Sequence, residues 1–141
     1  MATELSDLFN LNEKIVVITG AAGLLGQKHA EAIAAYGGTP VLLDLSKEAV
    51  DSVAATLSKK YSVNAVGFKV DITDESQIDN NLEEIKQRFK KIDCLVNNAA
   101  NNPKVEDKSK INFSRLENFP LDSWNKDLEV GLTGAFLCAK K

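Results

Sequence analysis

The sequence lacks an excess of positive charge, a long hydrophobic run and any cluster of cysteines or histidines. The formal net charge of −3 over 141 residues provides no basic surface for a nucleic acid or an anionic membrane. No apolar stretch approaches the roughly 20 residues of a transmembrane helix, and residues 1–12 contain acids and no apolar signal core. We therefore expect a cytoplasmic protein without a nucleic-acid or membrane partner.

The two cysteines and the single histidine provide little for a disulfide or a metal centre. Cys94 falls in an apolar run and Cys138 on one face of a predicted helix, so both are interpreted as buried thiols. His29 lies far along the chain from any candidate nucleophile, and we expect it at the surface. With 44% hydrophobic and 26% charged residues, the chain is predicted to form one domain with a substantial core and no metal site.

A glycine-rich turn directly follows an apolar run in the stretch KIVVITGAAGLLG, from Lys14 to Gly26. The β-branched run at 15–18 predicts a strand that is buried on both faces. Gly20 permits a tight turn, whereas Gly23 and Gly26 remove side chains where a pyrophosphate and the strand must approach closely. A helix that begins after the turn directs free N–H groups and its positive dipole end at such an anion. On the glycines alone, an ordinary closing turn remains the alternative.

Asp44 provides the context for this turn, because it ends a second apolar run and follows Gly26 by 18 residues. In a dinucleotide-binding fold, a carboxylate at this position accepts hydrogen bonds from the adenosine ribose and repels a 2′-phosphate. No arginine lies in the turn or just after Asp44, so the pattern predicts NAD rather than NADP. The alternative is that Asp44 caps the next helix, a position that Ser46 can also fill.

Strand and helix patterns alternate up to residue 100, which is typical of a parallel sheet with helices on both faces. The first helix is expected to end at the Gly37-Gly38 pair. Its expected core stripe is Leu25, Ala30, Ile33 and Ala34. This first helix is expected to run from Leu24 to Tyr36. The other expected helices run from Lys47 to Lys60 and along Ile78, Leu82, Ile85 and Phe89 after an Asp74…Gln77 start signal, and further strands are expected at Ala65 to Val70 and Ile92 to Val96.

Two of these strands end in residues that suit a nucleotide. The carboxylate of Asp71 can accept a hydrogen bond from the adenine amino group while the Ile72 amide reaches a ring nitrogen. Capping of the following helix is the alternative for Asp71. The fourth strand ends in Asn97-Asn98-Ala99-Ala100, whose small residues leave space for the cofactor's ribose.

Five motifs occur in a fixed order: Thr19-Gly20…Gly23…Gly26, Asp44, Asp71-Ile72, Asn97-Asn98-Ala99 and Trp124…Gly134. From residue 12 onward they resemble the N-terminal half of the short-chain dehydrogenase/reductase family. The resemblance implies a Rossmann-type doubly wound sheet of strand order 3-2-1-4, a nicotinamide cofactor and hydride transfer at an alcohol or carbonyl carbon. It also implies that Asn97 stabilises the sheet. The expected cofactor-binding residues are Thr19, Gly20, Ala22, Gly23, Leu24, Leu25, Gly26, Asp44, Leu45, Asp71, Ile72, Asn98, Ala99 and Ala100.

The chain departs from the family pattern at three places. Leu24 stands where the commoner turn has its second glycine, and the resulting spacing resembles that of nucleotide-sugar epimerases and dehydratases. Ala100 stands in the place of a glycine. Gly131 occupies the position of the family's catalytic asparagine, so the backbone carbonyl is kept while the amide side chain is lost.

The family's catalytic serine and Tyr-x-x-x-Lys follow the helix that begins at Pro120, and the 141 residues contain neither. Neither Tyr36 nor Tyr61 is followed by a lysine four residues later, so this chain is expected to bind a cofactor without turning it over. We interpret residues 1–141 as a single NAD-binding domain, truncated after its fourth strand and the following helix. A non-catalytic dinucleotide-binding or interaction module and an epimerase-like enzyme are the alternatives.

Such a truncation predicts surfaces that favour self-association. Residues 94–96 would form an apolar edge strand, and Leu132, Phe136 and Leu137 would lack packing partners, so we expect a homo-oligomer. The segment from Asn101 to Phe119 is too long for an ordinary connection, and a helical turn is expected at its end. Two interpretations of this segment stay open: it borders the substrate entrance, or it is a solvated loop without a ligand.

Overall fold

The computed structural model describes residues 8–101 and 115–141. Over these residues the chain forms a four-stranded sheet from β1 (Ile15–Thr19), β2 (Thr39–Asp44), β3 (Val66–Lys69) and β4 (Cys94–Val96). All neighbouring strands are parallel and lie in the order β3-β2-β1-β4. The register places Val17 of β1 between Val41 of β2 and Leu95 of β4. The predicted strand order is therefore confirmed.

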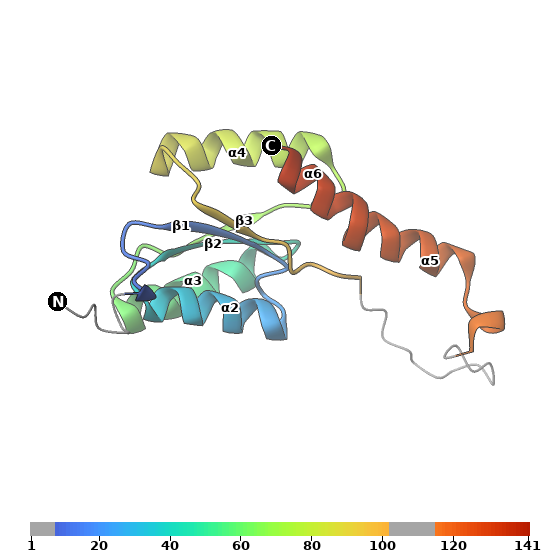
Figure 1. Ribbon diagram of the computed structural model, residues 1–141, viewed down its shortest axis with the longest axis horizontal. Coiled ribbons are helices and arrows are strands. Elements are labelled where there is room, and N and C mark those ends of the chain that lie inside the picture. The colour runs from blue at the N-terminus through green and yellow to red at the C-terminus, as the bar shows by residue number, and fades with distance from the viewer. Residues whose placement is uncertain (1–7, 102–114) are drawn as a thin grey trace.

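Helices cover both faces of this sheet. Figure 1 shows α2 and α3 on one face and α4 and α6 on the other, which confirms the doubly wound arrangement. A π-helix at Glu129–Gly134 connects α5 to α6. The helices are α2 (Leu24–Ala35), α3 (Lys47–Tyr61), α4 (Glu75–Phe89), α5 (Leu121–Leu128) and α6 (Ala135–Lys140).

β1 forms the centre of the core because all of its side chains are buried. Val16 and Ile18 belong to a cluster with residues of α2 and α3, whereas Ile15 and Val17 belong to a second cluster with residues of α4. Burial on both faces is typical of a central parallel strand, and it confirms the prediction for residues 15–18.

Local signals in the sequence set the helix boundaries. The Ser46 hydroxyl caps α3 by accepting a hydrogen bond from a backbone amide one turn later. Asp74 caps α4 by accepting hydrogen bonds from the amides of Ser76 and Gln77. After α2, Gly37 adopts a left-handed φ of 83°, which is the conformation that makes glycine favourable at a helix end.

Three predictions of burial are wrong. Leu25 is 64% exposed, and Gly26 is buried on α2 in its place. Cys94 is exposed because β4 forms an edge of the sheet, whereas Cys138 is half-buried. Leu137 is not left unpacked, because it lies against the second core cluster.

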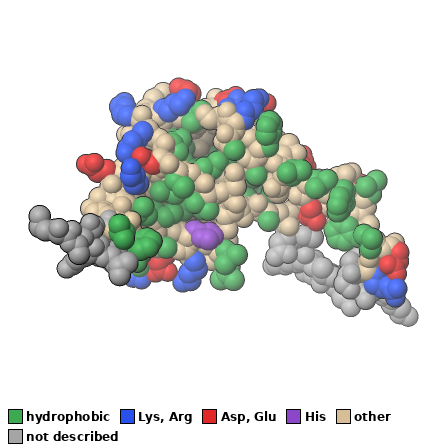
Figure 2. Space-filling model, viewed as in Figure 1, with side chains coloured by type: hydrophobic (Ala, Val, Ile, Leu, Met, Phe, Trp, Pro, Cys, Tyr) green, Lys and Arg blue, Asp and Glu red, His purple; other side chains and the backbone are tan. Residues whose placement is uncertain are grey.

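Residues Leu121–Lys140 form a C-terminal arm that extends beyond the sheet (Figure 1). Its apolar side chains include Trp124, Leu132 and Phe136, which are 51%, 65% and 61% exposed. Hydrophobic side chains gather over the α5 end of the molecule in Figure 2. The arm therefore presents an apolar surface of the kind that the expected homo-oligomer would cover.

Most of the predicted loop from Asn101 to Phe119 lies outside the described residues, at 102–114. Its end forms a 3₁₀ turn at Leu116–Asn118, which agrees with the predicted helical turn. His29 is exposed, as predicted. Among residues 8–101 and 115–141, no helix is both long and apolar enough to cross a bilayer.

Candidate functional site

A cavity of about 740 Å³ opens beside the carboxyl ends of the strands, near the point where the strand order reverses between β1 and β4. Ligands of open parallel sheets bind at such a switch point. All of the predicted cofactor-binding residues line this cavity except Thr19 and Ala22. The lining residues that sequence reasoning missed are Leu43, Val70, Thr73, Asn101, Lys126, Glu129 and Val130.

The glycines of the turn have different steric roles. Gly20 has a left-handed φ of +63°, and a Cβ there would lie 2.8 Å from the Ala99 Cα. A Cβ on Gly26 would lie 2.2 Å from the Gly20 carbonyl oxygen, so only glycine allows α2 to begin this close to the turn. A Cβ on Gly23 would meet the same oxygen at 3.2 Å. Packing therefore requires glycine at 20 and 26 and restricts position 23 least.

The amino end of α2 presents free backbone donors to the cavity. Its N-cap residue is Gly23, so no side chain caps the helix. The amides of residues 24–26 donate to no group among the described residues, and these three residues line the cavity. Because unpaired first-turn amides and the helix dipole attract anions, this end of α2 fits a pyrophosphate.

Thr19 and Asn98 join the end of β4 to the glycine turn. The buried Thr19 hydroxyl accepts hydrogen bonds from the amides of Asn98 at 3.1 Å and Ala99 at 3.0 Å. The Asn98 side chain donates to the carbonyls of Thr19 at 2.9 Å and Gly20 at 3.1 Å. The Asn97 side chain instead donates to a carbonyl of α6 at 3.3 Å. The expectation that Asn97 stabilises the sheet is therefore wrong, because Asn98 makes those contacts.

The Asp44 carboxylate connects the end of β2 to the glycine turn. Its Oδ2 accepts a hydrogen bond from the Ala22 amide at 2.9 Å, and its Oδ1 accepts one from the Leu45 amide at 2.8 Å. Because Ser46 is the N-cap of α3, the interpretation of Asp44 as that cap is wrong. Asp44 thus fixes the turn and lines the cavity, where it can also accept hydrogen bonds from hydroxyl groups.

Negative charge predominates in the lining of the cavity. Among the described residues that line it, three are carboxylates, namely Asp44, Asp71 and Glu129. Lys126 is the single cation of this lining, which contains no arginine. A ligand with an additional phosphate group would bring further negative charge into this surplus of carboxylates. The lining of the cavity therefore carries a net negative charge.

The π-helix contains two glycines in opposite environments. A Cβ on Gly131 would have no atom within 4 Å, so the structure has room for a side chain at this position. A Cβ on Gly134 would lie 2.7 Å from the Ile72 Cδ1, so Gly134 allows the arm to approach the loop after β3. π-Helical turns are frequent at functional sites, and Val130 of this turn lines the cavity.

A parallel sheet with a glycine turn, free amides at the first helix and carboxylates after two neighbouring strands defines a dinucleotide-binding fold of the Rossmann type. Residues 14–141 match the family model for short chain dehydrogenases. The chain belongs to this family, which confirms the resemblance of its motifs.

Curated relatives include both cofactor types. The chain is 35% identical to an NAD-dependent glycerol dehydrogenase of Listeria innocua, over 94% of this chain and 47% of that protein. It is 30% identical to an NADP-dependent mannitol dehydrogenase of Alternaria alternata, over 99% of this chain and 50% of that protein. The crystal structure of an NAD⁺-bound xylitol dehydrogenase superposes with a TM-score of 0.79 at 28% identity, over 92% of this chain and 46% of that one. The chain therefore spans about half the length of the relatives it matches.

Proposed function

We propose that the chain is the cofactor-binding half of an oxidoreductase that transfers hydride between NAD(H) and an alcohol or carbonyl substrate. The observation that carries this proposal is the junction of the glycine turn, the free amides of residues 24–26 and the Asp44 carboxylate. The amides would hold the pyrophosphate, and Asp44 would accept hydrogen bonds from the adenosine ribose. When bound, the nicotinamide supplies the hydride acceptor or donor.

The remaining predicted residues would shape the rest of the cofactor site. Thr19 would hold the end of β4 in place from behind the cavity. The small side chains of Ala99 and Ala100 line the cavity and would leave space for a ribose. Asp71 and the Ile72 amide would contact the adenine.

NAD is proposed over NADP on electrostatic grounds. The surplus of carboxylates at the cavity and the position of Asp44 at the end of β2 support this choice. The named relatives support neither cofactor over the other, because one is NAD-dependent and another NADP-dependent.

The chain's own tyrosines would take no part in proton transfer. The Tyr61 hydroxyl donates to Glu31 at 3.1 Å, and neither Tyr61 nor Tyr36 lines the cavity. We therefore propose that residues 1–141 bind and orient the cofactor and do not supply the acid–base group. We also propose that the apolar face of the C-terminal arm assembles the protein into a homo-oligomer, which sedimentation analysis would detect.

A non-catalytic dinucleotide-binding module is the second candidate, and Gly131 is the observation that favours it. Glycine at this position provides no amide side chain. Both candidates require NAD binding, but only the first requires hydride transfer by the full-length protein. Assaying the full-length protein with a panel of polyols and ketones, by NADH absorbance, would separate the two candidates. If the protein binds NAD but turns over no substrate, the non-catalytic module is favoured.

Isothermal titration calorimetry with NAD and NADP tests the cofactor assignment. The wild-type chain is expected to bind NAD at least about tenfold more tightly than NADP, because each hydrogen bond to a charged group contributes of the order of 1.5–3 kcal/mol. Asp44→Asn keeps an acceptor for the Ala22 amide but removes the charge, so the preference for NAD is expected to shrink. Asp51→Asn, on the outer face of α3, is the matched control and should leave the preference unchanged.

Two results would contradict the proposal. Equal or tighter binding of NADP by the wild-type chain would overturn the NAD assignment. An absence of binding for either dinucleotide by a chain whose circular dichroism shows it to be folded would overturn the cofactor site itself.

A further inference from the structure

Asp71 is held by hydrogen bonds through three of its four polar atoms. Its amide donates to the Gln77 Oε1 at 3.0 Å, and its carbonyl accepts from the Asp74 amide at 3.1 Å. Its Oδ1 accepts from the Thr73 amide at 2.9 Å and from the Thr73 hydroxyl at 2.7 Å. Only Oδ2 accepts no hydrogen bond from the described residues. The loop thus fixes the residue and leaves one carboxylate oxygen available.

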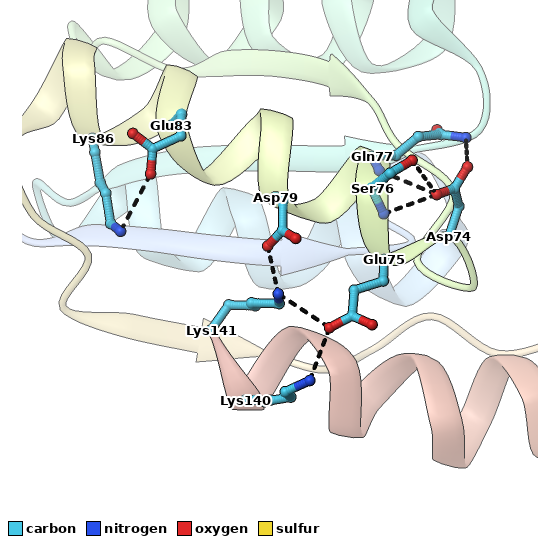
Figure 3. Close-up of polar contacts among 9 residues, drawn as sticks. All are labelled: Asp74, Glu75, Ser76, Gln77, Asp79, Glu83, Lys86, Lys140 and Lys141. Atoms are coloured by element: carbon cyan, nitrogen blue, oxygen red, sulfur yellow. Dashed lines mark hydrogen bonds and ion pairs between the residues drawn. The ribbon is translucent and has the colours of Figure 1, made fainter.

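Asp74 orients the Gln77 side chain that holds the Asp71 amide. The Gln77 Nε2 donates to the Asp74 Oδ2 at 2.9 Å, so the amide oxygen of Gln77 is directed to the Asp71 N–H. Figure 3 shows Asp74 at the centre of bonds from Ser76 and Gln77. These hydrogen bonds lower the pKa of Asp74 to about 2, which keeps its carboxylate ionised and able to accept at neutral pH.

This pattern differs from an ordinary capping box. In that motif the side chain at the third helical position bonds the amide of the N-cap residue itself. Here the amide of the N-cap residue, Asp74, donates to the Asp71 carbonyl, and Gln77 reaches three residues further back to Asp71. The helix start therefore serves Asp71 in addition to closing α4.

The loop is also fixed to its surroundings by packing. Ile72 is 6% exposed and lies against Gly134 of the π-helix. Val70, Asp71 and Thr73 line the cavity together with Ile72. The packing and the hydrogen bonds together hold Asp71 at the wall of the cavity.

We propose that Thr73 and Gln77 are positioning residues that present the free Oδ2 of Asp71 to the 6-amino group of the cofactor's adenine. The inference rests on the proposed binding of NAD. A 6-aminopurine donates a hydrogen bond to this oxygen, whereas a 6-oxopurine places its own oxygen against the carboxylate. The loop thereby selects the base of the dinucleotide.

The test compares binding of NAD with that of nicotinamide hypoxanthine dinucleotide, which carries a 6-oxo base, by calorimetry on the chain. The wild-type chain is expected to prefer NAD by about tenfold, and Asp71→Ala should remove most of this preference. Thr73→Val removes the hydroxyl donor at nearly constant shape and should reduce the preference at least about threefold. Thr73→Ser should restore it, because serine keeps the hydroxyl.

Gln77→Met provides a second variant of the same loop, and it should also reduce the base preference while the unfolding midpoint is monitored separately. Thr56→Val on the outer face of α3 removes a hydroxyl that bonds only its own helix, and it serves as the matched control. If Asp71→Ala changes the base preference but Thr73→Val and Gln77→Met do not, the positioning role is wrong. If Asp71→Ala has no effect on the ratio, the adenine contact is wrong while NAD binding stands. If the wild-type chain binds neither dinucleotide, the proposed function fails first.

Discussion

Glycines occur beside the cavity in two regions, the turn at residues 20–26 and the C-terminal arm, and their surroundings differ. In the turn, a Cβ on Gly26 would lie 2.2 Å from a carbonyl oxygen, and a Cβ on Gly20 would lie 2.8 Å from a neighbouring Cα. In the arm, Gly131 has open space around it, and the nearest atom to a Cβ on Gly134 is the flexible end of Ile72. Backbone contacts thus require glycine in the turn. In the arm, a flexible side chain restricts position 134, and no atom restricts position 131.

The difference reflects how far each region is packed by the described chain. The turn is enclosed by its own backbone and by the buried Thr19 hydroxyl. The arm leaves Leu132 and Phe136 more than half exposed. A change of one methyl group should therefore have a graded effect, largest where backbone opposes it and smallest in the arm.

Gly26→Ala is expected to have the largest effect. The added Cβ cannot avoid the Gly20 carbonyl without moving α2 away from the turn, so we expect a loss of at least about 3 kcal/mol in the free energy of unfolding. NAD binding should be lost as well, because the amides of residues 24–26 would move. Urea denaturation and calorimetry measure the two effects.

Gly23→Ala is the matched variant in the same turn. Its Cβ would meet one oxygen at 3.2 Å and Gly23 has an ordinary negative φ, so the cost should be about 1 kcal/mol or less. Equal destabilisation by Gly26→Ala and Gly23→Ala would show that a Cβ has the same effect at both positions. The steric ranking of the glycines in the turn would then be wrong.

The next smaller difference in unfolding free energy is expected between variants of the two glycines of the π-helix. Gly134→Ala places a methyl group against Ile72 and should cost about 1–2 kcal/mol in unfolding free energy. Gly131→Ala meets no atom and should stabilise the chain by about 0.5 kcal/mol, because alanine restricts the unfolded backbone. Thermal denaturation of both variants checks the signs, and destabilisation by Gly131→Ala would show that the open space is filled in solution.

The fold could be predicted because its signals are local. Strand and helix periods, the Ser46 and Asp74 caps and the Gly37 helix end each depend on residues within one or two turns. The position of Asp44 at the end of β2 followed from the spacing to the glycine turn. These features need no knowledge of tertiary contacts.

The contacts between strands could not be predicted in the same way. Asn97 and Asn98 are adjacent and chemically identical, and successive residues of an extended chain point to opposite sides. Which of them bonds Thr19 depends on the register of β4 against β1. The hydrogen bonds from Thr73 to Asp71 were also missed, although a threonine two residues after an aspartate is a recognisable turn signal.

Asn81 was missed for a different reason. It lies on the same face of α4 as Ile78 and Ile85, which flank it at helical spacing, but polar residues are mostly exposed, so the sequence pattern gives no signal for its burial. In the structure it is 6% exposed and makes no side-chain hydrogen bond within the described part of the chain. It lines a second cavity, of about 280 Å³, together with residues of the sheet and Cys138 of the arm.

Asn81→Leu tests the packing of this second cavity, where α4 and the C-terminal arm meet. Removal of a buried, unpaired amide and the gain of apolar volume should raise the free energy of unfolding by about 1 kcal/mol. Asn80→Leu on the exposed side of α4 is the matched control, with an expected change within about 0.5 kcal/mol. A loss of stability in Asn81→Leu would show that the amide has a partner in solution.

The ion pairs between α4 and the end of the arm should have the smallest effect. The Glu75 Oε1 lies 2.9 Å from the Lys140 Nζ and 3.1 Å from the Lys141 Nζ, and Lys141 also pairs with Asp79 (Figure 3). Glu75, Lys140 and Asp79 are about half exposed, and Lys141 is 21% exposed, so water and salt reach these ion pairs and screen their attraction. Glu75→Gln should accelerate amide hydrogen exchange in residues 135–140 at low salt and leave it unchanged at about 1 M salt.

Glu83→Gln is the control for this last prediction, because Glu83 pairs with Lys86 inside α4 and does not reach the arm.

The pH dependence of the ion pairs between α4 and the arm gives a second test. The lysines lower the pKa of Glu75 from its ordinary 4.5, so its contribution is complete above that value and lost as the pH falls. The acids raise the pKa of Lys141 from 10.5, so its contribution is complete below that value and lost as the pH rises. After correction for intrinsic exchange rates, protection of residues 135–140 should therefore be highest between these limits, and a flat pH profile would show that packing of Leu137 alone holds the arm.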